Sequence, residues 1–418
     1  MKVLLLGGGG REHAIGWKLA RSPLLECLIV APGNPGLSDV AALVPDLDIN
    51  DPEAVLHLAL ANSVDLVVVG PEAPLAAGVT DTLTGAGLAV CGPTRAGARL
   101  EASKKYAKDV MARAGVPTAA AEAFTGVDAA CAHLEQTDGP YVVKADGLAA
   151  GKGVLVTDDL DAARRWARFC IEGGFGEAGR TVIVERHLDG HEVSVFAICD
   201  GTRAIALAPA RDYKRLRDGD LGPNTGGMGC ISPPPALETG LVESTMDRVI
   251  APVLDVLSSD GVPYRGFLYA GLMVGSEGAV VLEFNCRLGD PETQALLPLL
   301  DSDLLPLLTQ AAAGDLTTAG VEWRDATAVD VVLAAEGYPE QPQRGGWIKG
   351  TDTADALDDV HVFHAGTRRT PEGLVTAGGR VLNVVGIGAD AARARARAYE
   401  GVATIHFDGM QFRTDIAG

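Results

Sequence analysis

Residues 2–20 read KVLLLGGGGREHAIGWKLA, and this stretch sets the class of the fold. Lys2–Leu6 predicts a buried strand, and a helical stretch follows the glycines from about Glu12 to Ala20, which is how a parallel α/β unit opens. Three more apolar strands follow, each ending at a Gly or Pro turn: Leu28–Ala31, Leu66–Val69 and Ala89–Cys91. We therefore expect a doubly wound parallel α/β domain over residues 1–101.

The remainder of the chain has two different patterns. A lysine-bearing helix over Ala102–Ala114 leads into alternating strands and helices, and the character changes near residue 325 to short hairpin-like strands and an Ala/Arg helix. The expected strands are Tyr141–Lys144, Val154–Thr157, Thr181–Glu185, Val193–Ile198, Val280–Arg287, Val360–His364 and Val381–Val385, and the last helix covers Ala389–Tyr399. Arg393, Arg395 and Arg397 are spaced by two on this helix, which scatters them around the cylinder instead of forming a nucleic-acid stripe.

Charge and composition exclude several classes of protein. The formal net charge of −20 repels nucleic acid and anionic membranes, so a phosphate ligand has to be captured locally. No apolar run is long enough for a membrane span or a signal peptide, and a cytoplasmic protein is expected. The cysteines lie far apart and without metal-site spacing, which predicts reduced core thiols: Cys27, Cys91, Cys131, Cys170, Cys199, Cys230 and Cys286.

The strand Val280–Arg287 carries the strongest chemical signal. Alternation predicts that its even positions are apolar and face inward, while Glu283, Asn285 and Arg287 project from the opposite face. A carboxylate and an amide oxygen at this spacing suit Mg²⁺, which leaves its other positions to water and phosphates. Arg287 would face the same phosphates. The turn that follows, residues 288–293, places further acids beside the end of the strand.

Residues 141–153, YVVKADGLAAGKG, predict a strand that ends in Lys144 and continues into a loop of small residues. Backbone N–H groups of such a loop can close over phosphates. The loop is not a P-loop, because the first glycine of that motif is replaced by Asp146, and Lys152 is followed by glycine instead of Ser or Thr. An ordinary surface turn is the alternative, and Lys104 alone would be read as a surface lysine.

The glycines at residues 7–10 suggest a dinucleotide-binding loop, but their register fails. The third glycine of G-x-G-x-x-G would fall on Glu12 or His13, and the second strand ends without an acid for a ribose. The N–H groups at a helix start and the guanidinium of Arg11 still predict a phosphomonoester site. Residues 221–229, LGPNTGGMG, predict a second, mobile glycine loop, with a simple connector as the alternative.

Taken in this order, the motifs resemble the phosphoribosylamine–glycine ligase (glycinamide ribonucleotide synthetase) family of ATP-grasp enzymes. The resemblance rests on residues 7–14, 31–36, 69–75, 144–154, 222–229 and 283–293, and it runs from Met1 to about Ile416. It implies an N-terminal domain 1–101 that binds phosphoribosylamine, an ATP-grasp domain 102–325 with a lid at about 120–190, and a small mixed β domain 326–418. The implied reaction joins glycine to 5-phosphoribosylamine at the expense of ATP with Mg²⁺ or Mn²⁺, in a monomer without nucleic-acid or membrane partners.

The residues and the resemblance together indicate a set of site residues. Lys104, Lys144 and the loop of Asp146, Gly147, Gly151, Lys152 and Gly153 are expected at ATP, Glu283 and Asn285 at the metal, and Arg287 at the transferring phosphoryl group. From the resemblance alone come Glu185 and Leu188 at adenine, Glu192 at the ATP ribose, Asp212 and Asp290 near glycine, Asn224, Gly226 and Gly227 in a substrate loop, and Gly9, Gly10, Arg11, Glu12, Asn34 and Glu72 around phosphoribosylamine. Arg287, Lys144 and Asp290 are the expected catalytic residues.

Two positions depart from the family pattern. Tyr213 stands where a histidine is expected before Lys214, and Arg186 stands where a second acid is expected after Glu185. These departures leave the exact glycine and adenine contacts open. Two other functions stay possible from the sequence: another ATP-grasp ligase with a different N-terminal site, and a dehydrogenase-like or non-catalytic nucleotide binder.

Overall fold

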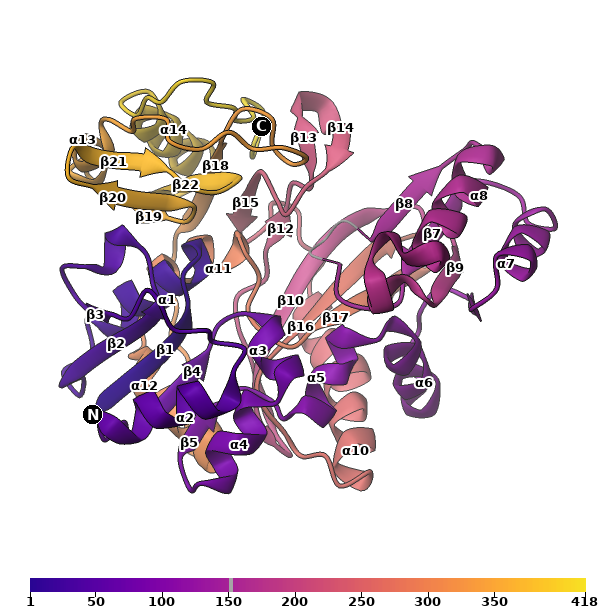
Figure 1. The fold of residues 1–418 in the computed structure, drawn as a ribbon, viewed down its shortest axis with the longest axis horizontal. Helices are drawn as coiled ribbons and strands as arrows, with labels where there is room; N and C mark the ends of the chain where they lie inside the picture. Colours follow the sequence, from indigo (N-terminus) through magenta and orange to yellow (C-terminus); the bar gives the residue numbers. More distant parts are fainter. Residues whose placement is uncertain (150–152) are drawn as a thin grey trace.

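The computed structural model describes residues 1–149 and 153–418. Figure 1 shows the N-terminal elements at the lower left and the C-terminal elements above them. On the right projects a smaller part, formed by residues 121–186, which we call the lid. Long antiparallel strands run between these parts. The expectation of a mixed α/β chain with a parallel N-terminal sheet and a small C-terminal β domain is confirmed.

The N-terminal sheet is parallel and has the order β3-β2-β1-β4-β5. Because the chain moves outward from β1 in both directions, the strand order reverses there, and open α/β sheets bind ligands beyond the carboxyl ends of the strands at such a point. The elements are β1 (Lys2–Gly7), α1 (Gly10–Leu19), β2 (Cys27–Pro32), η1 (Pro35–Leu37), β3 (Ala42–Leu43), α2 (Pro52–Ala61), β4 (Leu66–Val69), α3 (Glu72–Ala77), α4 (Val79–Gly85) and β5 (Ala89–Cys91).

The single helix expected over Ala102–Ala114 is wrong at its start. The chain forms α5 (Arg95–Ala102) and α6 (Lys104–Ala114), which are separated at Ser103. Ser103 has extended backbone angles, and its hydroxyl accepts a hydrogen bond from the Tyr106 amide, so it is the N-cap of α6. Lys104 is therefore the first residue of a helix.

The lid is an antiparallel sheet with the order β6-β9-β7-β8, covered by helices. Its elements are β6 (Ala121–Phe124), α7 (Val127–Leu134), β7 (Tyr141–Ala145), β8 (Val154–Thr157), α8 (Leu160–Phe169), η2 (Cys170–Gly174), η3 (Gly176–Gly179) and β9 (Val182–Arg186). Beside it lies the central antiparallel sheet β11-β10-β16-β17, made of β10 (His191–Gly201), β11 (Ala204–Ala206), β16 (Tyr264–Gly275) and β17 (Gly278–Asn285). The helices α9 (Leu241–Thr245), η5 (Met246–Ile250) and α10 (Ala251–Ser259) lead into β16.

The C-terminal sheet has the order β12-β15-β18-β22-β19, and its pairs are antiparallel. It contains β12 (Arg211–Asp212), β15 (Gly229–Ser232), β18 (Thr327–Ala334), β19 (Val360–His364) and β22 (Arg380–Gly388), with α13 (Thr351–Asp355), α14 (Ala391–Val402) and the hairpin of β20 (Thr367–Thr370) and β21 (Gly373–Thr376). Hydrogen bonds between β15 and β18 thus cross the boundary expected near residue 325.

The glycine loop expected over residues 221–229 is more ordered than its composition suggests. The chain forms a hairpin from β13 (Arg215–Arg217), η4 (Asp218–Asp220) and β14 (Leu221–Asn224) before it enters β15. The predicted loop is therefore shorter than expected, because residues 221–224 pair as a strand and only residues 225–228 stay outside the strands. Strand pairing supplies partners that local composition does not reveal.

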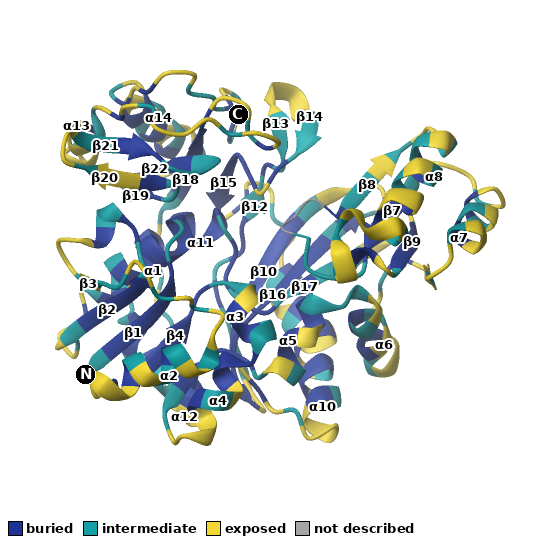
Figure 2. Cartoon of the chain, viewed as in Figure 1, coloured by how far each residue is buried: buried dark blue, intermediate teal, exposed yellow. Residues whose placement is uncertain are grey.

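The N-terminal, central and C-terminal sheets share one apolar core. One apolar cluster joins Val3 of β1, Phe196 of β10 and Val385 of β22 through α11 (Glu292–Leu296), η6 (Leu297–Leu299) and α12 (Leu304–Ala313). Figure 2 shows the strands of the central region buried, while the outer helices of the lid are largely exposed. Among the described residues, no helix is long and apolar enough to cross a membrane.

Candidate active site

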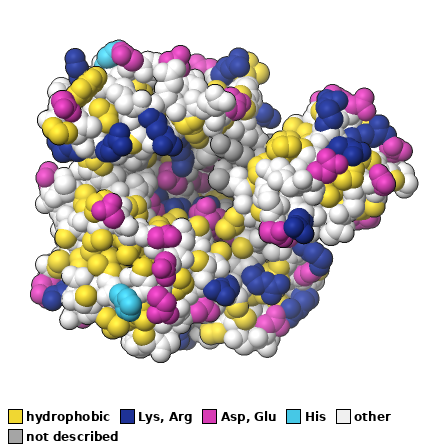
Figure 3. Space-filling model, viewed as in Figure 1, with side chains coloured by type: hydrophobic (Ala, Val, Ile, Leu, Met, Phe, Trp, Pro, Cys, Tyr) yellow, Lys and Arg dark blue, Asp and Glu magenta, His cyan; other side chains and the backbone are white. Residues whose placement is uncertain are grey.

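The expected site residues gather where the body meets the lid. Figure 3 shows a hollow between these parts in which acidic and basic side chains lie together. Loops that follow β1, β2 and β4 reach it from the N-terminal sheet, and the end of β17 reaches it from the central sheet. Segments far apart in the sequence therefore supply one site.

A β-bulge in β17 corrects the expected alternation of this strand. Gly271 of β16 pairs with Glu283 and Leu272 pairs with Val281, so Leu282 is an extra residue on β17. Val281 and Phe284 consequently lie in the main core, whereas Val280 and Leu282 pack in a separate apolar cluster. Bulges re-aim side chains beside functional sites. The prediction that all even positions share one face was wrong.

Glu283 lies within a group of cations. Burial alone would raise the pKa of its carboxyl, but the charges of Lys214, Lys104 and Lys144, with that of Arg287, outweigh burial and hold the pKa below its ordinary value. Burial likewise lowers the pKa of Lys104, against the attraction of Glu283. An ionised carboxylate among lysines suits triphosphate and a divalent ion together.

The donor set at Glu283 and Asn285 fits a hard divalent ion. One carboxylate and one amide oxygen are too few to enclose a cation, and the described residues hold no group of three or more His, Cys, Asp or Glu arranged to do so. Mg²⁺ typically takes one or two protein oxygens and completes its shell with water and substrate phosphates. The pair therefore suits an ion that arrives with a nucleotide.

Lys144 lies at the lid side of the site and is paired with Glu185. The two partners are 2.7 Å apart, and Lys108 contacts the other oxygen of Glu185 at 3.1 Å. Glu185, expected at adenine, is thus already shared by two lysines. Leu188 packs with Ala119 and Val280 in a small apolar cluster.

Arg287 lies just beyond β17 and ties the central region to the N-terminal sheet. Its Nη2 contacts Glu101 Oε1 at 2.7 Å and donates to Asn285 Oδ1 at 3.2 Å, and its Nε lies 3.4 Å from Glu72 Oε2. Burial would lower the pKa of Arg287, but Glu101 and Glu72 raise it above its ordinary value. Among the described residues Arg287 thus pairs with Glu101 and Glu72, whereas Asp290 of the turn that follows pairs with Arg380.

Asp290 is held from the C-terminal sheet. Arg380 Nη2 lies 3.1 Å from Asp290 Oδ1, Gln294 donates to the same oxygen at 2.8 Å, and Arg380 Nη1 donates to the Asp290 carbonyl at 2.6 Å. Burial would raise the pKa of Asp290, but Arg380 and Arg11 lower it. Arg380 also donates to the carbonyl of Gly226, so one guanidinium joins the acid to the glycine loop.

The loop after β1 is folded around Glu12. Glu12 Oε2 accepts the Gly9 amide at 2.7 Å, and Glu12 Oε1 contacts Arg11 Nε at 2.6 Å. Gly7 has φ +122°, and a side chain there would collide with Glu12. The Gly9 amide, expected at a phosphate, is therefore engaged by Glu12, and Arg11 Nη1 also donates to the Leu288 carbonyl at 3.2 Å.

Three further members of the expected phosphoribosylamine set lie beside this loop. The Asn34 amide donates to the carbonyls of Gly8, Gly9 and His364, so its side chain holds the loop in place. A side chain at Gly10 would collide with Asn383 and Gln294. Burial would raise the pKa of Glu72, but Arg287 and Arg11 lower it.

The expected glycine residues surround an unsatisfied acid. Oδ1 of Asp212 is buried and has no hydrogen-bond partner among the described residues. Burial and the nearby Glu292 raise the pKa of Asp212. Gly227 has φ +108°, and a side chain there would collide with Pro291 and Asp212, so this wall of the site accepts only glycine. Asn224 ends β14 nearby, and Glu192 pairs with Lys214.

Part of the small-residue loop has a structural role. Asp146 Oδ1 accepts the Lys105 amide at 2.7 Å, and its carbonyl accepts the Lys104 amide at 3.1 Å, so Asp146 helps cap α6. The Gly147 amide donates to the Ala178 carbonyl, and the Gly153 carbonyl accepts the Ala145 amide. The expected contacts of Gly151 and Lys152 lie outside the described residues.

Sequence reasoning missed several members of the site. Lys108 follows Lys104 by four residues on one helix face, a spacing that could have revealed it. Glu101, Glu292 and Arg380 carry no comparable local signal, because only tertiary contacts bring them to the site. Of the two departures, Arg186 pairs with Glu277 at 2.8 Å, with both side chains largely exposed.

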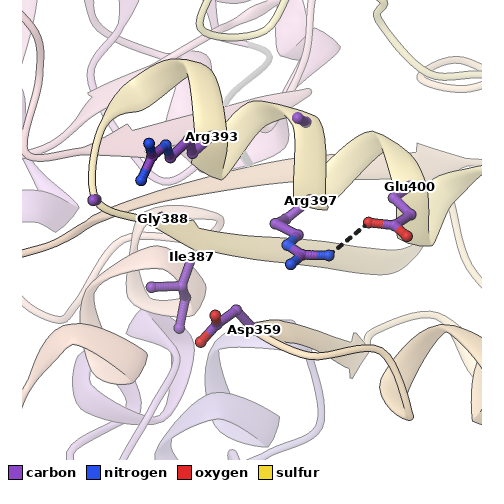
Figure 4. A pocket seen from close by; sticks show the side chains of 8 residues that line it. Asp359, Ile387, Gly388, Arg393, Arg397 and Glu400 are labelled. Atoms are coloured by element: carbon purple, nitrogen blue, oxygen red, sulfur yellow. Dashed lines mark hydrogen bonds and ion pairs between the residues drawn. The ribbon is translucent and has the colours of Figure 1, made fainter.

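A surface groove at the start of α14 lies away from this set. Figure 4 shows its lining, with Arg393 and Arg397 above Asp359 and Ile387. Arg397 pairs with Glu400 at 3.0 Å and Arg393 approaches Asp390. Arg395 instead turns to the carbonyls of Thr414 and Ile416, away from the groove. Arg393 and Arg397 are four residues apart and share one helix face, so the prediction that all three arginines scatter around the helix holds for Arg395 alone.

Comparison with known proteins shows one family that matches the chain in all three parts. Family models for phosphoribosylglycinamide synthetase match the chain at residues 1–101 (N domain), 102–293 (ATP-grasp domain) and 328–418 (C domain). Phosphoribosylamine–glycine ligases of Brucella melitensis and Streptomyces coelicolor are 48% and 50% identical, covering 100% of this chain and 97% and 99% of theirs.

Solved structures agree. The crystal structure of phosphoribosylamine–glycine ligase from Thermotoga maritima covers 100% of both chains with a TM-score of 0.85 at 35% identity. A biotin carboxylase from Campylobacter jejuni, at 15% identity and a TM-score of 0.75, shares the fold. Because the family models match all three domains and the relatives match over the full length, the chain belongs to the phosphoribosylamine–glycine ligase family of ATP-grasp carboxylate–amine ligases.

Proposed function

We propose that this protein joins glycine to 5-phosphoribosylamine in purine synthesis, forming glycinamide ribonucleotide, ADP and phosphate. The observation that carries the proposal is the chain of contacts from Asn285 through Arg287 to Glu72, beside a Glu283 that Arg287 and three lysines keep ionised by lowering its pKa. It joins the candidate ATP end of the site to the loops of the N-terminal sheet. Full-length family membership supports the same reaction.

The chemistry requires activation of a poor electrophile. A carboxylate oxygen of glycine attacks the γ-phosphorus of ATP, the bond to ADP breaks, and glycyl phosphate forms. The amine of phosphoribosylamine then attacks the carbonyl carbon, loses a proton and displaces phosphate. The protein positions these groups and neutralises charge. Mg²⁺ or Mn²⁺ supplies further charge neutralisation at the phosphates when bound at Glu283 and Asn285.

The residues take separate roles in this proposal. Lys104 and Lys144 hold the phosphates, and Arg287 faces the charge that develops on the transferring phosphoryl group. The unpartnered Asp212 Oδ1, with Asp290 nearby, suits the ammonium group of glycine. Arg11 binds the 5-phosphate through nitrogens not already used by Glu12 and Leu288.

The organisation of the chain follows the same proposal. We assign phosphoribosylamine binding to residues 1–101, ATP binding to residues 102–325 with the lid at about 120–190, and closure of the site to residues 326–418. That the enzyme acts as a monomer in the cytoplasm stays a prediction from the sequence.

The test is a coupled ADP-release assay with ATP and glycine, with and without freshly made phosphoribosylamine. ADP release is expected to require both co-substrates, and alanine in place of glycine is expected to give a small fraction of the rate. ADP release that does not depend on glycine would contradict the proposal and favour another ATP-grasp ligase. Nicotinamide binding without ATP turnover would favour the dehydrogenase-like alternative.

A further inference from the structure

The hairpin of β13 and β14 is gripped by residues 413–417, which we call the clamp segment. In Figure 1 the hairpin projects from the body beside the C-terminal end of the chain. Arg413 is the centre of the contact. Its side chain is only 2% exposed, although arginine is rarely buried without partners.

Arg413 reaches both the hairpin and its own segment. Its Nη1 lies 2.7 Å from Asp220 Oδ1 and donates to the Arg215 carbonyl at 3.3 Å. Its Nε and Nη2 bond both oxygens of Asp415 at 2.7 and 2.6 Å, a bidentate pair. These hydrogen bonds lower the pKa of Asp415 to about 2, so the pair stays charged at neutral pH.

Further hydrogen bonds join the clamp segment to the hairpin. The Thr414 amide donates to Asp218 Oδ1 at 2.8 Å, and the Gly219 amide donates to Asp415 Oδ2 at 2.7 Å. The segment itself is anchored to α14, because Tyr399 donates to the Arg413 carbonyl at 2.7 Å and Arg395 donates to the Thr414 carbonyl at 2.7 Å. The hairpin is therefore fixed to the C-terminal sheet through its tip.

Tyr213 connects the clamp segment to the site. Its hydroxyl accepts the Ala417 amide at 3.0 Å, and the Arg413 guanidinium lies 5.2 Å from its ring centroid. Successive side chains of an extended chain point to opposite sides, so a Tyr213 turned toward the clamp segment leaves Asp212 and Lys214 turned toward the site. Tyr213 also bonds the chain at Met228 and Gly229, at the far end of the glycine loop.

We propose that the clamp segment, acting through Arg413 and Tyr213, is a positioning element that sets the affinity of the site for its amino-acid substrate. The inference rests on the proposed function, in which glycine binds at Asp212 and Asp290, beside the substrate loop of Asn224, Gly226 and Gly227. Neither Arg413 nor Tyr213 touches substrate in this arrangement. They act by holding the hairpin in one orientation, and misplacement of such groups is costly.

The test compares Arg413→Gln and Asp218→Ala with the parent protein. Asp218 is exposed, so its replacement removes its two hydrogen bonds from Thr414 without disturbing the core. Both variants are expected to raise KM for glycine, on the order of tenfold for Arg413→Gln, with little change in KM for phosphoribosylamine. Arg413→Lys should recover part of the loss. Arg397→Gln on α14 is the control for Arg413→Gln, and Asp247→Ala at an exposed position of η5 is the control for Asp218→Ala. Both controls should behave like the parent.

Limited trypsin digestion gives a readout without turnover. Arg215 and Arg217 lie in the hairpin, and their peptide bonds are expected to be cut several-fold faster in both variants. If folded Asp218→Ala keeps parental glycine kinetics and parental trypsin resistance, the proposal is overturned, and equal rises in every KM overturn it as well. If the parent shows no glycine-dependent ADP release, the proposed function fails, whereas the digestion still decides whether the clamp exists.

Discussion

In the proposed function, single side chains at the end of β17 decide how the nucleotide is held. Glu283 and Asn285 are the proposed oxygen ligands of a divalent ion, and the surrounding cations keep Glu283 ionised by lowering its pKa. The bulge at Leu282 aims this pair into the site. Arg287, two residues beyond Asn285, is fixed by acids from the N-terminal sheet and α5.

Glu283→Gln and Asn285→Ala are each expected to weaken productive binding of Mg–ATP, because the two side chains share one ion. Activity should recover in part as Mg²⁺ is raised, since mass action compensates for a weaker site. Steady-state kinetics across a Mg²⁺ titration measure this. Parental kinetics for both variants at low Mg²⁺ would show that the metal lies elsewhere.

Arg287→Ala is expected to lower kcat by about 10²–10³, the usual loss when a donor to transition-state charge is removed. KM for ATP should change little, because Lys104 and Lys144 remain. The variant should also melt at a lower temperature, since Glu101 would be left buried without its partner.

Arg287→Lys separates the two effects. It keeps the charge beside Glu101 but loses the planar guanidinium, so the melting temperature should recover more than kcat does. A lysine variant with parental kcat, or an alanine variant with reduced melting temperature and near-normal kcat, would assign Arg287 a structural role alone.

At the scale of elements, the loop between β1 and α1 is the proposed phosphate site of a negatively charged protein. Glu12 organises the loop by accepting the Gly9 amide and pairing with Arg11. The guanidinium of Arg11 then stands at the N-terminus of α1, where the helix dipole also favours an anion.

Arg11→Ala is expected to raise KM for phosphoribosylamine by tenfold or more while KM for ATP stays within about twofold, because a charge-assisted bond to phosphate is lost from one substrate only. Arg21→Ala, just beyond the other end of α1, is the control, since Arg21 stacks on Trp17 and bonds its carbonyl. Equal rises for both substrates would indicate a misfolded N-terminal sheet.

At the scale of the whole molecule, buried histidines join the first helix to the C-terminal sheet. His13 Nδ1 of α1 accepts the backbone amide of His364 in β19 at 2.7 Å. Burial and the charge of His364 lower the pKa of His13 to about 3, and burial and the charge of Arg369 lower the pKa of His364 to about 4. Both rings are therefore neutral in the folded protein at neutral pH.

The pH dependence of stability follows from the lowered pKa values of His13 and His364. Between about pH 3 and the unfolded pKa near 6.5, the unfolded chain binds protons that the folded chain does not, so stability is complete above 6.5 and falls as the pH is lowered. One unit of pKa depression corresponds to about 1.4 kcal/mol. Melting temperatures should thus fall by several degrees per pH unit below 6.5.

His13→Gln keeps a hydrogen-bond acceptor but does not titrate, so its melting temperature should fall less steeply between pH 6.5 and 4. His57→Gln, at an exposed position of α2, should follow the parent. Parallel slopes for parent and His13→Gln would show that this interface does not govern acid stability.

Local patterns in the sequence determined the parallel opening domain. They also predicted a phosphate and metal site from Lys104, Lys144, Glu283, Asn285 and Arg287, and the structure brings the charges of these lysines and of Arg287 close to Glu283. These features depend on neighbours within a few residues: alternation along a strand, glycines at a strand end and the residue types that phosphates and hard cations require. They are readable because the physics that fixes them is local. The order of the motifs along the chain indicated the family.

Only the tertiary structure decided which charged side chains pair with one another. Arg380 lies 90 residues from Asp290 and Arg287 lies 186 residues from Glu101, so no local pattern links them. The bulge in β17 depends on its pairing with β16, and the entry of β12 and β15 into the C-terminal sheet depends on pairing with β18. Strand register and the burial of charge are settled by what packs opposite each residue, and that is a property of the whole fold.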